Sequence, residues 1–166
     1  MMENKTRNLK AVGSNLQKIV SRLQSNQNLL KLLYYTDKDP LSKEDLNEAQ
    51  IRNEVFNKLI KIIPRVGPKE NAKSLIALRV TQGSLNKENN QIQDLVIGIE
   101  IFVPLTQWII KDENLRPFCI MGEIEKSLNG KTVDGFGKIE GGDFSLNFLT
   151  EEISCYSMEY YITTYD

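Results

Sequence analysis

Histidine is absent from this sequence of 166 residues. Because histidine is the commonest general base and the commonest protein ligand of metal ions, its absence excludes Ser-His-Asp and Cys-His catalysis. Cysteine is also scarce. Cys119 and Cys155 lie far apart and form neither a disulfide framework nor a zinc-binding pattern. We expect both thiols to be reduced and buried, and we expect no metal ion and no cofactor.

A complete phosphate-binding motif is missing as well. Gly130-Lys131-Thr132 comes nearest, but a P-loop needs a glycine five residues before Gly130, and this chain has Glu125 there. We interpret these three residues as the end of a helix. Neighbouring acidic residues elsewhere in the chain are interpreted as solvated surface. The sequence therefore predicts a protein that is not an enzyme.

An excess of charge of either sign is also lacking. The chain has 21 basic and 22 acidic residues, a formal net charge of −1 and a sequence pI near 5.7. Without a large positive field, nucleic-acid binding is disfavoured as the main activity. Near-neutrality also gives little electrostatic protection against self-association, which suits an assembling protein.

Long apolar runs do not occur. The most apolar segment, Leu95–Leu105, contains Glu100 and Pro104 and is far shorter than the roughly 20 residues of a membrane helix. Residues 1–8 have no apolar centre, so we expect no signal peptide. These features predict a cytoplasmic protein.

Helical spacing of apolar residues dominates the first part of the chain. It predicts a first helix over residues 9–23 and a second that is capped by Ser25 and ends at Tyr34-Tyr35 before Pro40.

Ser42 and Asp45 form a weak capping-box pattern ahead of a third predicted helix, which ends at Pro64. Its apolar stripe is Ile51, Val55, Leu59 and Ile62.

The apolar period then changes to two, which is typical of strands. Residues 76–81 and 95–103 are predicted to pair as an antiparallel hairpin around the polar loop Gly83–Gln91. The expected sheet core is Ile76, Leu78, Val80, Leu95, Ile97, Ile99, Ile101 and Val103.

A fourth helix is predicted to begin at Asp112 or Asn114, with Pro117 in its first turn, and to end at Asn129-Gly130. A short glycine-rich strand and two further strands follow. Phe118, Phe144 and Phe148 are expected in the core.

This order of elements predicts an α+β fold, in which an antiparallel β-sheet carries helices packed on it and an N-terminal helical segment precedes it. We expect one domain over residues 1–166, with N-terminal helices in 1–50 and the α+β sheet core in 51–166.

Several residues are candidates for contacts with other subunits. Glu100 lies within an apolar strand, where it either pairs with Arg79 of the neighbouring strand or another subunit, or faces solvent. Trp108, Tyr161 and Tyr165 are either ordinary packing residues or interface residues, because tyrosine and tryptophan are enriched at interfaces. We expect the polar loop Gly83–Gln91 to become ordered only when the protein assembles. The interface candidates within this loop are Asn86, Glu88, Asn89 and Asn90.

Five segments together resemble small structural proteins at the head–tail joint of tailed bacteriophages, the tail-terminator or neck-connector class. The segments are Leu29–Ser42, Ile101–Ile110, Leu115–Phe118, Ile124–Lys131 and Gly141–Cys155. The order of elements from residue 51 onward is also similar to that class. The helices before residue 50 depart from its minimal version.

This resemblance implies a structural virion protein that forms a homo-oligomeric ring, expected to be hexameric, at the head–tail junction. Its partners would be further copies of itself, the tail tube protein and the capsid-side connector protein. DNA would pass through the ring without specific binding, and no membrane would be involved. The protein would reside in the host cytoplasm during assembly and then in the virion. The alternatives are a cytosolic assembly adaptor or chaperone that leaves the particle, and a small ligand-binding or enzymatic domain.

Overall fold

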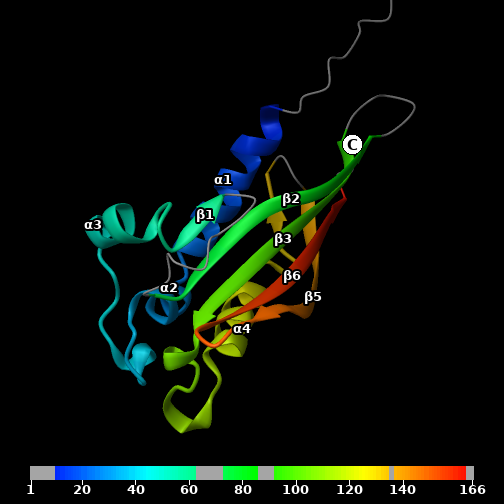
Figure 1. Cartoon of the computed structure of the whole chain (residues 1–166). Coiled ribbons are helices and arrows are strands. Elements are labelled where there is room, and N and C mark those ends of the chain that lie inside the picture. The colour runs from blue at the N-terminus through cyan, green and yellow to red at the C-terminus, as the bar shows by residue number, and fades with distance from the viewer. Residues whose placement is uncertain (1–9, 63–72, 86–91, 135–136, 164–166) are drawn as a thin grey trace, which may run out of the picture.

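A computed structural model describes residues 10–62, 73–85, 92–134 and 137–163 of the chain (Figure 1). The α-helices in these residues are α1 (Lys10–Gln24), α2 (Gln27–Tyr34), α3 (Glu48–Gln50) and α4 (Arg116–Leu128). The strands are β1 (Ile60–Ile62), β2 (Leu75–Leu85), β3 (Ile92–Pro104), β4 (Thr132–Val133), β5 (Gly137–Leu149) and β6 (Ile153–Thr163). Short 3-10 helices occupy Pro40–Ser42, Leu105–Gln107 and Lys111–Glu113.

The strands form one sheet in the order β1-β2-β3-β6-β5-β4. Neighbouring strands are antiparallel except β1 and β2, which run parallel. Helices α1, α2 and α4 lie behind the sheet in the view of Figure 1, so they cover one of its faces. We call this the helix face and the other the open face. The predicted α+β class, with helices on a largely antiparallel sheet, is confirmed.

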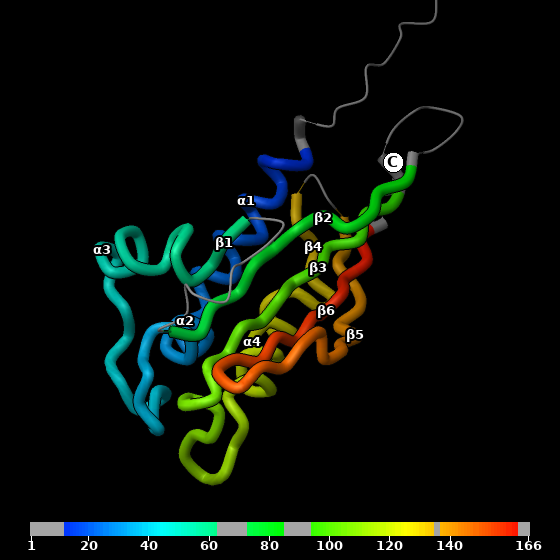
Figure 2. The backbone as a smooth tube through the Cα atoms, viewed as in Figure 1, coloured from blue at the N-terminus to red at the C-terminus, as the bar shows by residue number. Residues whose placement is uncertain are grey.

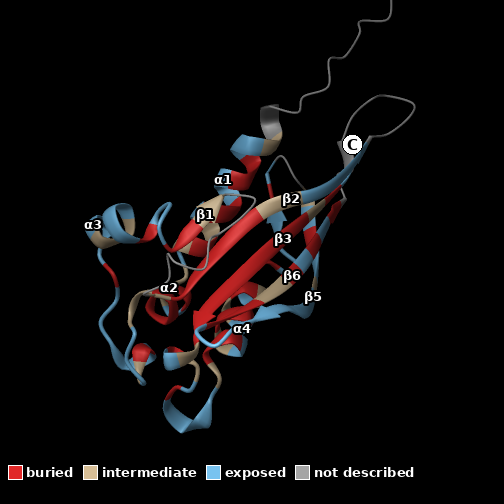
Figure 3. Ribbon diagram, in the orientation of Figure 1, coloured by how far each residue is buried: buried red, intermediate tan, exposed pale blue. Residues whose placement is uncertain are grey.

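The core is centred on β3, which lies between β2 and β6 in Figure 2. Figure 3 shows β3 largely red, together with the part of β2 that begins at Leu75. All eight residues predicted for the sheet core are buried except Val80, which is half-buried. The leucines of α2 complete this core from the helix side (Leu29, Leu30, Leu32 and Leu33). Alternating apolar residues on β3 bury one face of the strand because successive side chains point to opposite faces.

The third predicted helix is wrong beyond Val55. Helix α3 continues into a π-helical turn, Ile51–Val55, and Asn57 then adopts a positive φ of 56°. Asparagine tolerates this left-handed conformation better than most residues, and it reverses the chain. Ile60–Ile62 then joins the sheet as β1. Val55 and Leu59 are both buried, so their spacing indicated burial correctly and conformation incorrectly.

Two predicted helix caps are also wrong. Asn26, not Ser25, is the N-cap of α2, and its side chain accepts a hydrogen bond from the Leu29 N–H. The capping box lies at Asn47 and Gln50, not at Ser42 and Asp45.

Helix α4 begins at Arg116, later than predicted, with Pro117 in its first turn as expected. It ends before Asn129 and Gly130, the latter with a φ of 70°. The prediction for the C-terminal end is confirmed.

Three strands are longer than predicted. β3 spans Ile92–Pro104 where residues 95–103 were expected. β2 extends to Leu85 and so includes the start of the expected polar loop. β5 joins the two separate strands that were predicted around Gly141 and Phe144. A register shift between Gly141 and Asp143 accommodates the glycines. Gly141 has a φ of 135°, and a Cβ atom there would lie 2.6 Å from the Glu159 carbonyl oxygen. The bulge in β5 at this position therefore requires glycine.

Candidate functional site

An exposed apolar surface extends over β5 and the adjoining end of α4. Phe144 of β5 is 57% exposed, Leu146 is 51% exposed, and Phe118 of α4 is 42% exposed. We call the following residues the β5 surface: Phe118, Phe144, Leu146, Phe148 and Leu149. In Figure 3 the exposed β5 contrasts with the buried centre of the sheet. Contiguous exposed apolar groups of this kind mark interaction sites in soluble proteins.

Aromatic contacts hold part of this surface in place. The Phe118 ring lies 6.0 Å from the Phe144 ring, edge to face, and 5.5 Å from the Tyr156 ring. Trp108 is half-buried and packs against Tyr156 at 6.2 Å. These centroid separations are in the favourable range for aromatic pairs. The exposed rings therefore rest on a fixed base, which lowers the entropy cost of binding a partner.

The β5 surface continues around the edge of the sheet. Phe144 and Leu146 pair with Met158 and Tyr156 and project on the helix face, beyond the cover of α4. A register shift follows Leu146, and Phe148 then points to the open face, where its ring lies 6.0 Å from the Phe102 ring. One strand thus presents apolar side chains on both faces.

The backbone of β5 also has an open outer edge. β4 pairs only with Gly137 and Lys138, and no other strand in the described residues lies on the outer side of β5. Ile139 is still paired on this side, through backbone hydrogen bonds with Gly130 and Lys131. From Glu140 to Leu149 the outer side of β5 has no strand partner within the described chain. An exposed apolar edge strand is a template for adding a strand from another chain.

The prediction of Phe118, Phe144 and Phe148 as core residues is wrong. The alternation identified the strand correctly, but α4 leaves Phe144 exposed on the helix face, and Phe148 lies on the open face, away from α4. A signal was present in the sequence, since Phe148 and Leu149 are adjacent apolar residues. Adjacent positions in a strand point to opposite faces, so they place apolar groups on both sides of it.

Arg79 and Glu100 form a cross-strand ion pair, which is one of the two arrangements considered for Glu100. Arg79 Nη1 lies 2.7 Å from Glu100 Oε1, and Glu100 is only 8% exposed. Asn147 Nδ2 on β5 also donates to Glu100 Oε1 at 3.3 Å, across the small Ser157 of β6. The pair borders an open hollow of about 290 Å³. These contacts tie three strands together on the open face.

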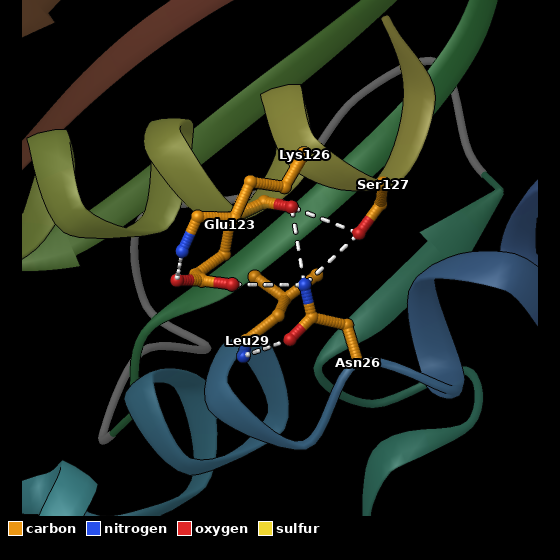
Figure 4. Close-up of polar contacts among 5 residues, drawn as sticks. All are labelled: Asn26, Leu29, Glu123, Lys126 and Ser127. Carbon is orange, nitrogen blue, oxygen red and sulfur yellow. Dashed lines mark hydrogen bonds and ion pairs between the residues drawn. The ribbon is translucent and has the colours of Figure 1, made fainter. Parts of the chain in front are cut away.

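Glu123 does not join Arg79 and Glu100. It lies on α4, where its carboxylate accepts hydrogen bonds from Asn26 Nδ2 at 3.0 Å and Lys126 Nζ at 2.7 Å (Figure 4). Asn26 Nδ2 also donates to Ser127 Oγ at 3.0 Å. Glu123 therefore lies apart from the Arg79–Glu100 pair. Instead, Glu123 fixes α4 to the start of α2.

A second contact fixes α4 to the sheet and so positions Phe118. The buried Tyr160 hydroxyl donates to Glu125 Oε2 of α4 at 2.9 Å. Burial, and next the hydrogen bond to this carboxylate, raise the pKa of Tyr160. The hydroxyl therefore stays protonated and keeps its role as donor.

Tyr160 and Tyr161 face opposite sides of β6, because successive side chains of a strand alternate. Tyr161 is 44% exposed on the open face, whereas Tyr160 is buried on the helix face. Trp108 packs against the core and is half-buried, and its contact with another subunit stays a prediction. The remaining candidates lie outside the described residues: Tyr165, Asn86, Glu88, Asn89 and Asn90.

Cys119 and Cys155 are both free cysteines. Cys155 is buried as expected, and burial raises its pKa to about 12. Cys119 is only half-buried, which corrects its prediction, and burial raises its pKa too. Over the part of the chain that the structure describes, no three His, Cys, Asp or Glu residues are grouped to hold a metal ion. Nor does any helix in those residues have the length and apolarity to span a membrane.

The fold and the β5 surface define an α+β protein with an exposed apolar surface at a sheet edge. The chain belongs to the YomW family, whose model matches residues 26–162. YomW is a phage-derived, SPBeta prophage-like family, so this is a phage protein. No curated protein matches the sequence.

Proposed function

We propose that this chain is a structural, non-enzymatic protein of the phage particle that assembles into a ring at the head–tail junction. The ring, expected to be hexameric, joins the tail tube to the capsid-side connector and lets DNA pass. It forms in the host cytoplasm and remains in the virion.

The observation that carries this proposal is the β5 surface at the open edge of the sheet. Its apolar side chains lie on both faces, and aromatic residues dominate it. Aromatic anchors supply much of the binding energy at protein interfaces. Membership of a phage-derived family and the resemblance to head–tail joining proteins support the position in the particle. A net charge of −1 suits a channel that lets DNA pass without holding it.

The test is complementation of a phage that lacks this chain. A variant with Phe144→Lys and Leu146→Lys is compared with a control that has Leu41→Lys and Ile109→Lys. All four residues are exposed and apolar, but only the first two lie on β5. We expect the wild type and the control to restore joined particles, and the β5 variant to leave heads and tails separate.

Particle composition provides the second readout. Mass spectrometry of purified particles should find several copies per particle, and electron microscopy should show a closed ring at the head-proximal end of the tail. Particles that carry one copy contradict the ring. Particles that lack the chain, although its loss still blocks joining, identify an assembly adaptor instead.

A further inference from the structure

The open edge of β5 lacks the residues that usually protect an edge strand. Natural edge strands are kept from pairing by charged side chains, by proline or by shortness. Residues 144–149 contain no charged residue and no proline, and β5 is a strand of 13 residues. Phe144 and Leu146 are both more than half exposed there. This edge is therefore suited to pairing with a strand of another chain.

Hydrogen bonds at the start of β5 show which of its backbone groups point outward. The Ile139 N–H donates to the Lys131 carbonyl at 2.9 Å, and the Ile139 carbonyl accepts from the Gly130 N–H at 2.8 Å, both on the outer side of the strand. Backbone groups of an antiparallel strand turn alternately to one neighbour and the other. The β6 partners of Ile139, Phe144 and Leu146 are an even number of residues apart, so all three have the same direction. These partners are Ile162, Met158 and Tyr156. Phe144 and Leu146 therefore direct their N–H and carbonyl groups outward.

One register of β5 with a second β5 satisfies all of these outward groups. When Ser145 lies opposite Ser145 of a second copy in antiparallel order, Phe144 of each copy lies opposite Leu146 of the other. Both are then hydrogen-bonded pairs, and each such pair exchanges two backbone hydrogen bonds. The two Ser145 residues form the non-hydrogen-bonded pair between them.

The side chains match in the same register. On the helix face, the two pairs of Phe144 with Leu146 are apolar. On the open face, Ser145 meets Ser145, and Asp143 lies opposite the neutral amide of Asn147. Apolar cross-strand pairs stabilise neighbouring strands, whereas like charges directly opposite destabilise them. The strand is thus complementary to itself in both backbone and side chains.

The neighbouring registers lack this match. With Phe144 opposite itself, Leu146 would lie opposite Gly142, which has no side chain to contact. With Leu146 opposite itself, Phe144 would lie opposite Phe148, which points to the open face, where it contacts Phe102. Register shifts on both sides of residues 143–146 also limit the regular contact to this short window. Pairing in the Ser145 register is therefore specific and short.

We propose that the free protein binds a second copy of itself through the open edge of β5, in antiparallel order and centred on Ser145. The contact is isologous, because both copies use the same strand, and it stops at a dimer. This goes beyond the proposed function, since it concerns the free chain and not its place in the particle. One edge accepts one strand, so the dimer has to open before β5 binds any other partner.

The first test is disulfide cross-linking of the purified full chain in a Cys119→Ser background, with the buried Cys155 left in place. Ser145→Cys places two thiols opposite each other in the proposed dimer. Non-hydrogen-bonded pairs have Cα atoms about 4.5 Å apart, within the range that a disulfide spans. Glu140→Cys is the matched control, because Glu140 is exposed on the same strand. In the proposed register its two copies are ten positions apart, roughly 30 Å along the strands.

We expect mild oxidation of Ser145→Cys to give covalent dimers in roughly ten times the yield of Glu140→Cys, or more, at the same protein concentration. Unchanged melting curves will show that both variants fold.

Two substitutions at Leu146 then separate the backbone contact from the side-chain contact. Leu146→Ala removes the side chain but keeps the N–H, whereas Leu146→Pro removes both. Because this N–H points outward, proline leaves the hydrogen bonds to β6 in place. Sedimentation at about 10 μM to about 1 mM detects a Kd anywhere in this range. We expect the wild type to dimerise, Leu146→Ala to raise the Kd, and Leu146→Pro to raise it roughly ten-fold further.

Three results would overturn the proposal. Equal cross-linking yields for Ser145→Cys and Glu140→Cys would show that the two β5 edges do not meet at Ser145. A Kd that is the same for Leu146→Ala and Leu146→Pro would place the dimer contact elsewhere. A wild type that stays monomeric over the whole concentration range would exclude the dimer. These results are separate from the proposed function, because absence of the chain from particles would contradict the virion role without affecting the cross-link.

Discussion

Replacement of the buried Arg116 tests how the helices are held together. Arg116 is fully buried at the start of α4. Its guanidinium donates to four backbone carbonyl oxygens, of Gln107 at 2.8 Å, Leu32 at 2.7 Å, Tyr35 at 2.8 Å and Asp37 at 2.6 Å. These carbonyls belong to the end of α2, the segment after it and the segment after β3. One side chain therefore connects three parts of the chain.

The expected cost of Arg116→Met follows from these contacts. Methionine fills much of the same space but donates no hydrogen bond. The loss of folding free energy therefore reflects the missing polar contacts more than a cavity. A hydrogen bond to a charged group contributes about 1.5–3 kcal/mol, but such contributions do not add when the acceptors can relax or reach water. A buried carbonyl oxygen that loses its donor costs about 1–3 kcal/mol, so four such losses with partial relaxation should cost about 3–5 kcal/mol in all. We expect a decrease in that range, a large part of the stability of a typical domain.

Urea unfolding measures this decrease directly. Trp108 is the chain's single tryptophan and lies next to Gln107. The backbone carbonyl of Trp108 accepts a hydrogen bond from the backbone N–H of Arg116 at 2.8 Å. The fluorescence of Trp108 reports on this region, and circular dichroism reports on the whole fold. Arg116→Lys is the control. Lysine keeps the positive charge but lacks the planar guanidinium group and its several N–H donors. Arg116→Lys should therefore lower the free energy of unfolding less than Arg116→Met does. A loss below about 1 kcal/mol for Arg116→Met would refute the assigned role.

Three further predictions concern the sheet. Ile99→Ala should lower the free energy of unfolding by about 2–5 kcal/mol in denaturant titrations, because Ile99 is fully buried; a loss under about 0.5 kcal/mol contradicts its core position. Burial raises the pKa of Cys155 from 9.0 to about 12, so its contribution to stability is complete below about pH 9 and is lost as the pH rises toward 12. Unfolding titrations at several pH values should show a smaller alkaline loss in Cys155→Ala, and equal losses argue against this cause. Tyr161→Ala should leave the monomer folded, since Tyr161 is 44% exposed, but should weaken assembly in the complementation assay; unfolding of the monomer would mark Tyr161 as a core residue.

The sequence predicted the centre of the sheet well because β3 repeats its apolar residues with an unbroken period of two. It predicted the region around β1 poorly. Val55 and Leu59 have helical spacing, and only the left-handed Asn57 and the pairing of Ile60 with Ile76 show that the chain becomes a strand. Tertiary pairing overrides local spacing there, and no local pattern encodes it.

The candidate site shows the same limit. Alternation places Tyr160 and Tyr161 on opposite faces of β6, and their burial differs accordingly. Exposure of Phe144 could not be predicted in this way, since alternation states which face a residue occupies but not whether a helix covers that face. Coverage depends on the length and position of α4, which are set by contacts between distant segments such as Tyr160 with Glu125.

The central position of β6 has a consequence for synthesis on the ribosome. β6 lies between β3 and β5, although it is the last of the six strands to be translated. Until it emerges, β5 has no sheet to join, and β3 exposes an apolar edge of its own. The nascent chain can therefore form its helices and the β2–β3 hairpin early, but the sheet must wait for the final strand. Incomplete chains consequently lack a formed β5 edge and cannot enter an assembly through it.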